Sequence, residues 1–216
     1  MTNEKFIVLD TETANTLEDP FVYDIGFAVI NSNGKVYETH SYVVYDIFYG
    51  ESDLMKESYF ADKIPQYNEE IRKGLRAVRR LKTIKFILRD VCAQWNIKAI
   101  IAHNARFDYN SLQTTQRYTT SSKYRWFFPY GVEIWDTLKM ARNVFGKDEQ
   151  YKAYCEENNF LTNYGKPRMT AEVLYRYIKG NKDFIESHTG LEDVMIEKEI
   201  FVECLKRNSN VERCLW

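Results

Sequence analysis

The sequence predicts an α/β fold built on a mixed five-stranded sheet, in which three antiparallel strands precede two strands reached through helices, with helices on both faces. Three observations lead to this prediction. Residues 6–9 (FIVL) are typical of a buried central strand. Residues 31–34 (NSNG) favour a hairpin, because Asn and Gly tolerate the positive φ angles of tight turns. Amphipathic helical periods after residue 69 supply the covering layers.

Composition indicates one globular domain, residues 1–216, long enough to bury a full hydrophobic core. A hydrophobic content of 44% and a charged content of 28% are ordinary for soluble proteins. The formal net charge of −1 argues neither for nor against nucleic acid, because acidic metal ligands would offset basic contacts in the same count. No apolar run approaches the roughly 18 residues that suggest a membrane span.

Cysteine use and the N-terminal residues lead us to expect a cytoplasmic protein. The 4 cysteines lie far apart without a Cys-x-x-Cys pair, which argues against zinc and redox motifs and favours a reducing compartment. Residues 1–5 lead directly into the first strand and lack the features of a signal peptide.

The first strand, residues 6–13, carries two carboxylates near its end. Asp10 and Glu12 are two residues apart, so they project from the same face of a strand. At about 4 Å two such charges repel by about 1 to 4 kcal/mol. A bound divalent cation is a common reason for such a pair. The structural alternative is that one acid caps the strand and the other is solvated.

Short connections join the early strands. After a loop at residues 14–20, strands are predicted at residues 22–30 and 36–44, which completes an antiparallel meander. Residues 45–67 show no clean period, so we expect an irregular segment that covers the sheet.

Helical periodicity begins at about Glu69 and is clearest over residues 81–95. The densest basic run lies in this region: Arg72, Lys73, Arg76, Arg79, Arg80 and Lys82. These side chains could bind the phosphates of a nucleic acid strand. The interpretation we favour is the solvated face of a helix.

A polar motif follows the fourth strand, residues 98–102. Residues 103–108 (HNARFD) come directly after it, at a place where α/β proteins often build a site. Asn104 is expected to be the N-cap of the next helix. Asp108, one turn further, is either a site residue or a first-turn acid stabilised by the helix dipole.

We expect the segment that follows Asp108 to have a mainly structural role. Residues 114–125, rich in Ser, Thr, Lys and Arg, predict a loop, which with residues 126–130 either guides a substrate or packs under the fifth strand, residues 132–136. Asp136 is expected to cap the helix that follows. Two more helices are predicted, at residues 149–157 and 170–179.

The last motif precedes the C-terminal helix. His188 and Asp193 are five residues apart, about 140° around a helix, so they could not share a face if both were helical. Gly190 indicates that His188 lies in the loop before the helix and reaches the site from another direction. Taken singly, a loop histidine and a helical aspartate are usually surface residues.

Together the motifs resemble the DEDD superfamily of 3′→5′ exonucleases, and specifically its DEDDh, or DnaQ-like, branch. Asp-x-Glu lies on the first strand, His-Asn-x-x-x-Asp follows the fourth, and His-x-x-x-x-Asp opens the final helix. The resemblance runs from Asp10 to Asp193. In the sister branch a tyrosine stands four residues before the last Asp, and here that position is Thr189, which excludes that branch.

The resemblance implies a ribonuclease H-like fold and two Mg²⁺ or Mn²⁺ ions about 3.5–4 Å apart. Asp10 would bridge both ions, Glu12 and Asp193 would hold the ion that carries the attacking water, and Asp108 would support the other, partly through water. His188 would be the general base. The resemblance also implies two substrate-binding residues, Thr13 and Asn104. Residues 14–15 depart from the small residue followed by Gly-Leu that relatives often carry, which leaves the loop against the terminal base undefined.

The implied function is metal-dependent 3′→5′ hydrolysis of single-stranded nucleic acid, with DNA favoured over RNA, for proofreading or end-trimming and with release of nucleoside 5′-monophosphates. Two alternatives stay open: an RNA-trimming exoribonuclease similar to oligoribonuclease, and a non-catalytic module that binds nucleic acid or docks on a polymerase. The implied partners are DNA or RNA 3′ ends, with a polymerase or another replication or repair protein and a homodimer both compatible with the resemblance, and no membrane.

Overall fold

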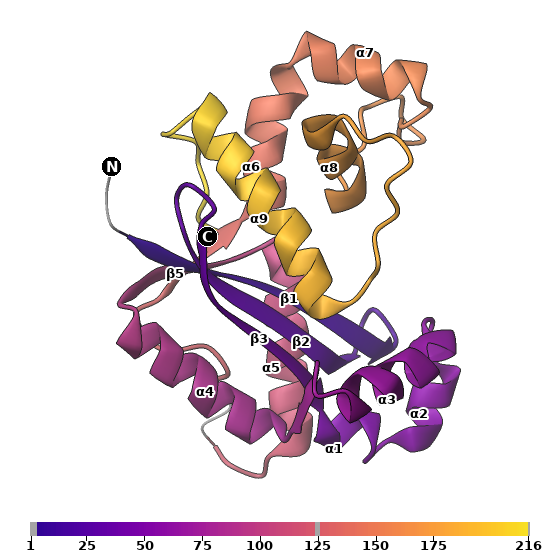
Figure 1. Ribbon diagram of the computed structural model, residues 1–216, viewed down its shortest axis with the longest axis vertical. Coiled ribbons are helices and arrows are strands. Elements are labelled where there is room, and N and C mark those ends of the chain that lie inside the picture. The colour runs from indigo at the N-terminus through magenta and orange to yellow at the C-terminus, as the bar shows by residue number, and fades with distance from the viewer. Residues whose placement is uncertain (1–3, 124–125, 216) are drawn as a thin grey trace.

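One mixed sheet of six strands organises the residues described by the computed structural model, 4–123 and 126–215, in the order β4-β3-β2-β1-β5-β6 (Figure 1). Sequence features at residues 1–3 and 124–125 lie outside this range. The first three strands are antiparallel, and β4, β5 and β6 run parallel to their neighbours. The strands are β1 Lys5–Asn15, β2 Pro20–Asn31, β3 Val36–Val44, β4 Ala77–Arg79, β5 Ile97–Ala102 and β6 Glu133–Asp136.

The predicted α/β sheet is confirmed, with one strand more than expected. The additional strand, β4, has three residues and pairs in parallel with the end of β3. A strand of three residues is too short to show an alternating pattern, which is why the sequence did not reveal it.

Helices cover both faces of this sheet. They are α1 Tyr45–Phe48, α2 Ser52–Glu57, η1 Ala61–Lys63, α3 Ile64–Arg72, α4 Leu81–Gln94, α5 Ala105–Thr119, α6 Thr137–Val144, η2 Phe145–Lys147, α7 Glu149–Glu157, α8 Ala171–Lys179 and α9 Gly190–Arg207. The predicted helix at 149–157 is confirmed, and that at 170–179 is confirmed with Thr170 as its N-cap and Gly180 closing it in the left-handed conformation. None of the helices in the described ranges is both long and apolar enough to span a bilayer.

Two predictions of irregular structure were wrong. Residues 45–67 form α1, α2, η1 and the start of α3 rather than an irregular cover. The predicted loop at residues 114–125 begins only after α5 ends at Thr119. Thr115 is fully buried there, donating to Ser111 O at 2.7 Å and accepting the Val22 N–H at 2.9 Å. These contacts satisfy a polar side chain inside a helix whose composition suggested a loop.

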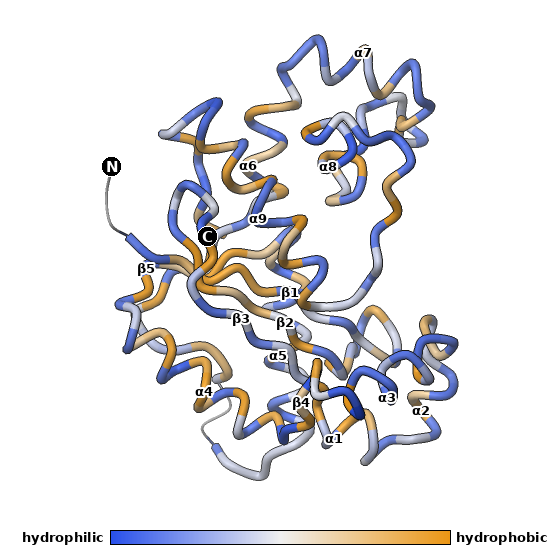
Figure 2. The backbone as a smooth tube through the Cα atoms, in the orientation of Figure 1, coloured by the Kyte–Doolittle hydropathy of each residue, from blue (hydrophilic) through white to orange (hydrophobic). Residues whose placement is uncertain are grey.

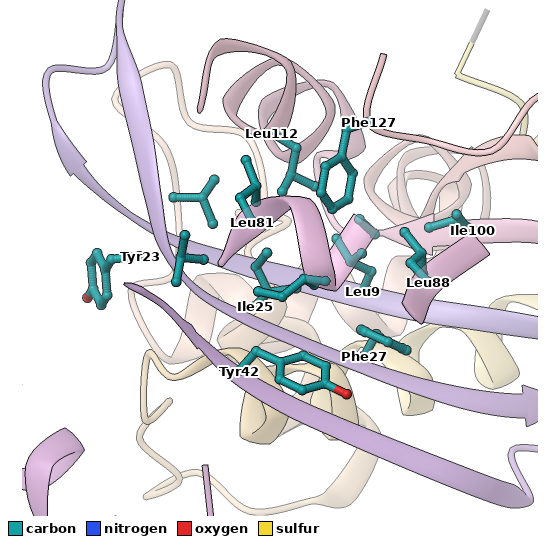
Figure 3. Close-up of a cluster of buried hydrophobic side chains, with 14 of the residues drawn as sticks. Leu9, Tyr23, Ile25, Phe27, Tyr42, Leu81, Leu88, Ile100, Leu112 and Phe127 are labelled. Carbon is teal, nitrogen blue, oxygen red and sulfur yellow. The ribbon is translucent and has the colours of Figure 1, made fainter. Parts of the chain in front are cut away.

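The alternation of side chains along β1 divides the core in two. Ile7 and Leu9 face one cluster with α4 and α5, in which Leu81, Leu88 and Leu112 pack on the sheet (Figure 3). Phe6 and Val8 face the other cluster, beneath α6, α8 and α9: its members include Ala28, Ile101, Met140, Leu174, Ile200 and Phe201. Many of the hydrophobic residues accordingly lie in the central strands (Figure 2). By the same alternation, Asp10 and Glu12 fall on the α9 face.

The start of α9 touches the backbone of β2. A Cβ atom on Gly26 would lie 2.2 Å from Gly190 C and Leu191 N, which leaves no room for a side chain. Gly26 pairs with Asp10 across the β1–β2 ladder. The two glycines therefore let the first turn of α9 settle directly over the acidic part of β1.

A buried arginine fixes the same junction and corrects the interpretation of the basic run. Residues 72–82 are not one helical face but span the end of α3, β4 and the start of α4. Arg76 is 3% exposed and donates through Nη1 to both carboxylate oxygens of Asp24, at 2.8 and 3.0 Å. It also pairs with Glu70 and, at 2.9 Å, with Glu192 of α9. Because it is buried and fully paired, Arg76 holds elements together instead of meeting solvent.

The Gly26→Ala variant should be strongly destabilised, because a methyl group would collide with backbone atoms that cannot rotate away. Overpacking of this kind costs about 1–3 kcal/mol or more, and the loss would be measured by urea unfolding. Gly146→Ala is the matched control, since within the described part of the chain its Cβ would meet only Met169 Cε, at 3.9 Å. A Gly26→Ala midpoint equal to that of Gly146→Ala would show that the close contact is not needed.

Candidate active site

A cavity of about 720 Å³ opens beside β1, between the sheet and the first turns of α9. Its lining is strongly acidic on one side and carries two arginines at the rim. The ionisable lining residues are Asp10, Glu12, His103, Arg142, Arg168, Glu186, His188, Asp193 and Glu197. Three of the elements that supply them, β1, α6 and α9, meet here only through the tertiary fold.

Glu12, His188 and Asp193 come together as the sequence motif implied. One ligand atom from each lies within 4.8 Å of the others, a spacing that could hold a metal ion. α9 begins at Gly190, so His188 lies in the preceding loop, as expected, with a positive φ of 50°. Asp193 accepts the Thr189 backbone N–H at 3.0 Å, which fixes the carboxylate beside the loop.

Asp10 lines the same cavity and has a buried oxygen, Oδ2, with no hydrogen-bond partner among the described residues. Asp108 lies behind it rather than on the cavity wall. Its side chain is 5% exposed, and its Oδ1 accepts a hydrogen bond from Thr11 Oγ1 at 2.8 Å. The charge of Asp108 still raises the pKa of Asp10, so the two acids belong to one electrostatic cluster.

Glu197 is a fifth acid of this cluster, itself buried, and the sequence motifs did not identify it. It lies one helical turn after Asp193, is 3% exposed, and has an unpartnered Oε2. The sequence could have pointed to Glu197, because an acid at this position interrupts an apolar helix face that includes Val194, Ile200 and Phe201.

Burial is the main reason that the pKa values of these carboxyls are raised. It raises the pKa of Glu12 to about 8, with the charge of Asp193 adding to the rise, and that of Asp193 to about 8. It raises the pKa of Asp108 to about 7, with the hydrogen bond from Thr11 opposing the rise. The pKa values of Asp10 and Glu197 also lie well above their usual range, through burial and then through neighbouring carboxylates. Such a cluster favours either bound protons or bound cations.

Two residues between α2 and α3 hold the loop that carries His188. The sequence had suggested only that their segment covers the sheet. Lys63 Nζ donates to Ser187 O at 2.5 Å and to His188 O at 3.1 Å. The Phe60 ring stacks on the imidazole, with centroids 5.0 Å apart and planes inclined by 22°. Burial, and then the charge of Lys63, lowers the pKa of His188. The ring is therefore neutral near pH 7 and able to accept a proton.

The remaining expected residues have different outcomes. Asn104 precedes α5 and lines the cavity, but its side chain does not cap the helix; its backbone N–H donates to Asp136 Oδ1 at 3.0 Å. Its left-handed backbone, φ 63°, departs from the extended conformation of a capping residue. Asp136 caps α6 by accepting the Leu138 N–H, as predicted. Thr13 follows a register shift after Glu12 and does not line this cavity, so its contact with substrate stays a prediction.

The donor set suits a hard divalent cation. Carboxylate oxygens are the ligands that Mg²⁺ and Mn²⁺ prefer. The unpartnered buried oxygens of Asp10 and Glu197 supply lone pairs that no donor among the described residues satisfies. The residues at this site therefore fit a metal centre.

Known structures share this fold, although no family model and no curated protein matches the sequence. A structure of E. coli exonuclease I in complex with a 5cy-dT13 oligonucleotide aligns with a TM-score of 0.62 at 15% identity, covering 95% of this chain and 41% of that chain. The ExoI/SSB-Ct complex aligns with a TM-score of 0.60 at 16% identity, covering 95% and 42%. Exonuclease X in complex with 5′ overhanging duplex DNA aligns with a TM-score of 0.50 at 15% identity, covering 94% and 93%.

These alignments confirm the expected ribonuclease H-like fold. The chain spans about two fifths of the length of the exonuclease I structures and nearly all of exonuclease X. At these identities the similarity establishes the fold, and any shared activity must be argued from the site.

Stability without metal should fall as the pH rises from 5.5 to 8. The folded-state pKa values of Glu12, Asp108 and Asp193 are raised to about 7–8, whereas carboxyls in the unfolded chain have pKa values of about 4. Between these values the folded state keeps protons that the unfolded state releases, so stability is lost as the pH approaches 8. The lowered pKa of His188 acts in the opposite direction, but it is one group against several acids.

Urea unfolding in EDTA at pH 5.5 and at pH 8 would measure this fall, which we expect to be on the order of 1 kcal/mol or more. Saturating Mg²⁺ at pH 8 should restore the midpoint. A midpoint in EDTA that is constant or rises with pH would contradict the acid cluster.

Proposed function

We propose that this protein is a metal-dependent 3′→5′ exonuclease of the DEDDh type, formed by a single domain over residues 1–216 and acting on single-stranded DNA. The observation that carries the proposal is the convergence of Glu12, His188 and Asp193 within 4.8 Å of one another, beside the buried and unpartnered Oδ2 of Asp10. A buried acid cluster with a neutral histidine at its edge is suited to metal-assisted hydrolysis of a phosphodiester.

In this proposal Asp10, Glu12, Asp108 and Asp193 would hold two Mg²⁺ or Mn²⁺ ions, with Asp10 shared between them. When bound, the ions supply positive charge at the scissile phosphate and lower the pKa of a bound water. Asp108 would act partly through water, which agrees with its place behind the cavity wall and its hydrogen bond from Thr11.

His188 accepts a proton from the attacking water at an imidazole nitrogen. The water oxygen bonds to the phosphorus of the terminal nucleotide as the bond from that phosphorus to the 3′ oxygen of the preceding nucleotide breaks. The leaving oxygen takes a proton from solvent. The products are a nucleoside 5′-monophosphate and a strand one nucleotide shorter with a new 3′ hydroxyl.

Substrate binding would use the basic rim of the cavity. Arg142 and Arg168 line it and are exposed, so they can approach the phosphates that precede the scissile bond. One of the aligned exonuclease I structures holds a dT13 oligonucleotide and the exonuclease X structure holds duplex DNA, which supports DNA rather than RNA as the substrate.

Replacement of Asp10 or Asp193 by Ala should reduce nucleotide release to background, because each removes a metal ligand, while circular dichroism shows a folded protein. His188→Ala should slow release by about 10²- to 10⁴-fold, the usual contribution of a general base. Asp53→Ala, an exposed acid on α2 away from the cavity, is the matched control. Full activity of Asp10→Ala would refute the metal site, and full activity of His188→Ala would refute only the general-base role.

Digestion of 5′-labelled and 3′-labelled oligonucleotides of DNA and RNA, with Mg²⁺ or with EDTA, tests the whole proposal. We expect Mg²⁺-dependent shortening of 5′-labelled DNA one nucleotide at a time, and immediate release of the 3′ label as mononucleotide. Faster shortening of RNA would identify an RNA-trimming enzyme instead. Tight binding without metal-dependent degradation would identify a non-catalytic module.

A further inference from the structure

Glu197 has no role in the four-acid arrangement proposed above. It follows Asp193 by four residues on α9, so both side chains lie on one face of the helix. The side chain is 3% exposed and lines the cavity together with Asp10. No ion pair forms with Glu197 among the described residues, and a buried carboxylate without an opposing charge is costly to keep unless a partner compensates it.

The hydrogen bonds of other buried acids show what a structural role looks like in this chain. Both oxygens of Asp24 accept from Arg76, and its Oδ2 also accepts from Tyr67 and from the Gly190 backbone. The Glu197 carboxyl accepts a hydrogen bond from the His103 backbone, but its Oε2, like the Oδ2 of Asp10, has no partner among the described residues. Two buried carboxylate oxygens in the same cavity thus keep lone pairs that a structural network would have used.

We propose that Glu197 is a fifth metal ligand, and that its Oε2 and the Oδ2 of Asp10 coordinate the same divalent cation from α9 and β1. The proposal rests on the proposed metal-dependent function and adds one carboxylate to its ligand set. A hard divalent cation is the chemistry that satisfies both oxygens at once. The competing explanation is a protonated Glu197 that donates a hydrogen bond to Asp10 and never contacts a metal.

The Glu197→Gln variant distinguishes these explanations, because its amide can donate the same hydrogen bond but carries no charge. Metal binding is measured directly by titration of Mn²⁺ into metal-free protein at pH 8, followed calorimetrically and without nucleic acid. If Glu197 is a ligand, the dissociation constant should rise by at least about 10-fold, since even the loss of a group that only supports a ligand usually costs that much. In EDTA the variant should melt at a higher temperature than the wild type, because the loss of one charge relieves repulsion within the cluster.

Glu199→Gln is the matched control, since it removes a charge from the same helix at a residue that pairs with Lys179 and Lys198 outside the cavity. Its Mn²⁺ affinity should equal that of the wild type. Glu197→Asp keeps the charge but shortens the side chain, so it should fold and bind Mn²⁺ more weakly than the wild type.

Each outcome has a distinct meaning. Wild-type Mn²⁺ affinity in Glu197→Gln would overturn the proposal, and so would wild-type affinity in Glu197→Asp if the Gln variant does not fold. A Glu197→Gln protein that melts at a lower temperature than the wild type in EDTA would assign Glu197 a structural role instead. A wild-type protein that binds no Mn²⁺ would refute the metal-dependent function itself, which separates that failure from the failure of this inference.

Discussion

The site depends on the close contact between the backbone of β2 at Gly26 and the first turn of α9 at Gly190. A single methyl group at Gly26 would lie 2.2 Å from the α9 backbone, so the approach is possible only without a side chain. Gly26 pairs with Asp10 across the sheet, and therefore the contact delivers Asp193 and Glu197 to the acids of β1. Arg76 secures the junction by pairing with Asp24 of β2 and with Glu192 of α9.

This geometry forces like charges together, and the rest of the fold must compensate for the repulsion. Two apolar clusters, one on each face of the sheet, provide the opposing stabilisation. Burial drives the pKa values of the carboxyls upward, so at neutral pH the cluster competes for protons or cations. Repulsion among the carboxylates of the metal-free protein and the proposed affinity for divalent cations would both follow from this arrangement. The proposed enzyme would use the affinity for cations.

The sequence predicted the features that depend on local pattern. The apolar run before Asp10, the hairpin after β2 and the loop position of His188 all follow from periodicity, turn chemistry and spacing. Features that depend on tertiary contacts could not be predicted from the sequence. Arg76 looks like a surface residue in the sequence because its partners are contributed by distant elements, and β4 is too short for a pattern. Lys63 and Phe60 act on the histidine loop from a segment 125 residues away, counting from Lys63 to His188. Glu197 could have been identified in the sequence as an acid on an apolar helix face, but it is not part of the four-acid motif.

The proposed enzyme depends most on Asp10, which would lie at the centre of a two-ion site. An X-ray structure of the protein crystallised with Mn²⁺ and a nucleoside 5′-monophosphate tests it most directly, because anomalous scattering locates each ion independently of the protein atoms. We expect two anomalous peaks about 3.5–4 Å apart, both within coordination distance of the Asp10 carboxylate. Peaks that are absent from this cavity, or a single peak that does not touch Asp10, would contradict it.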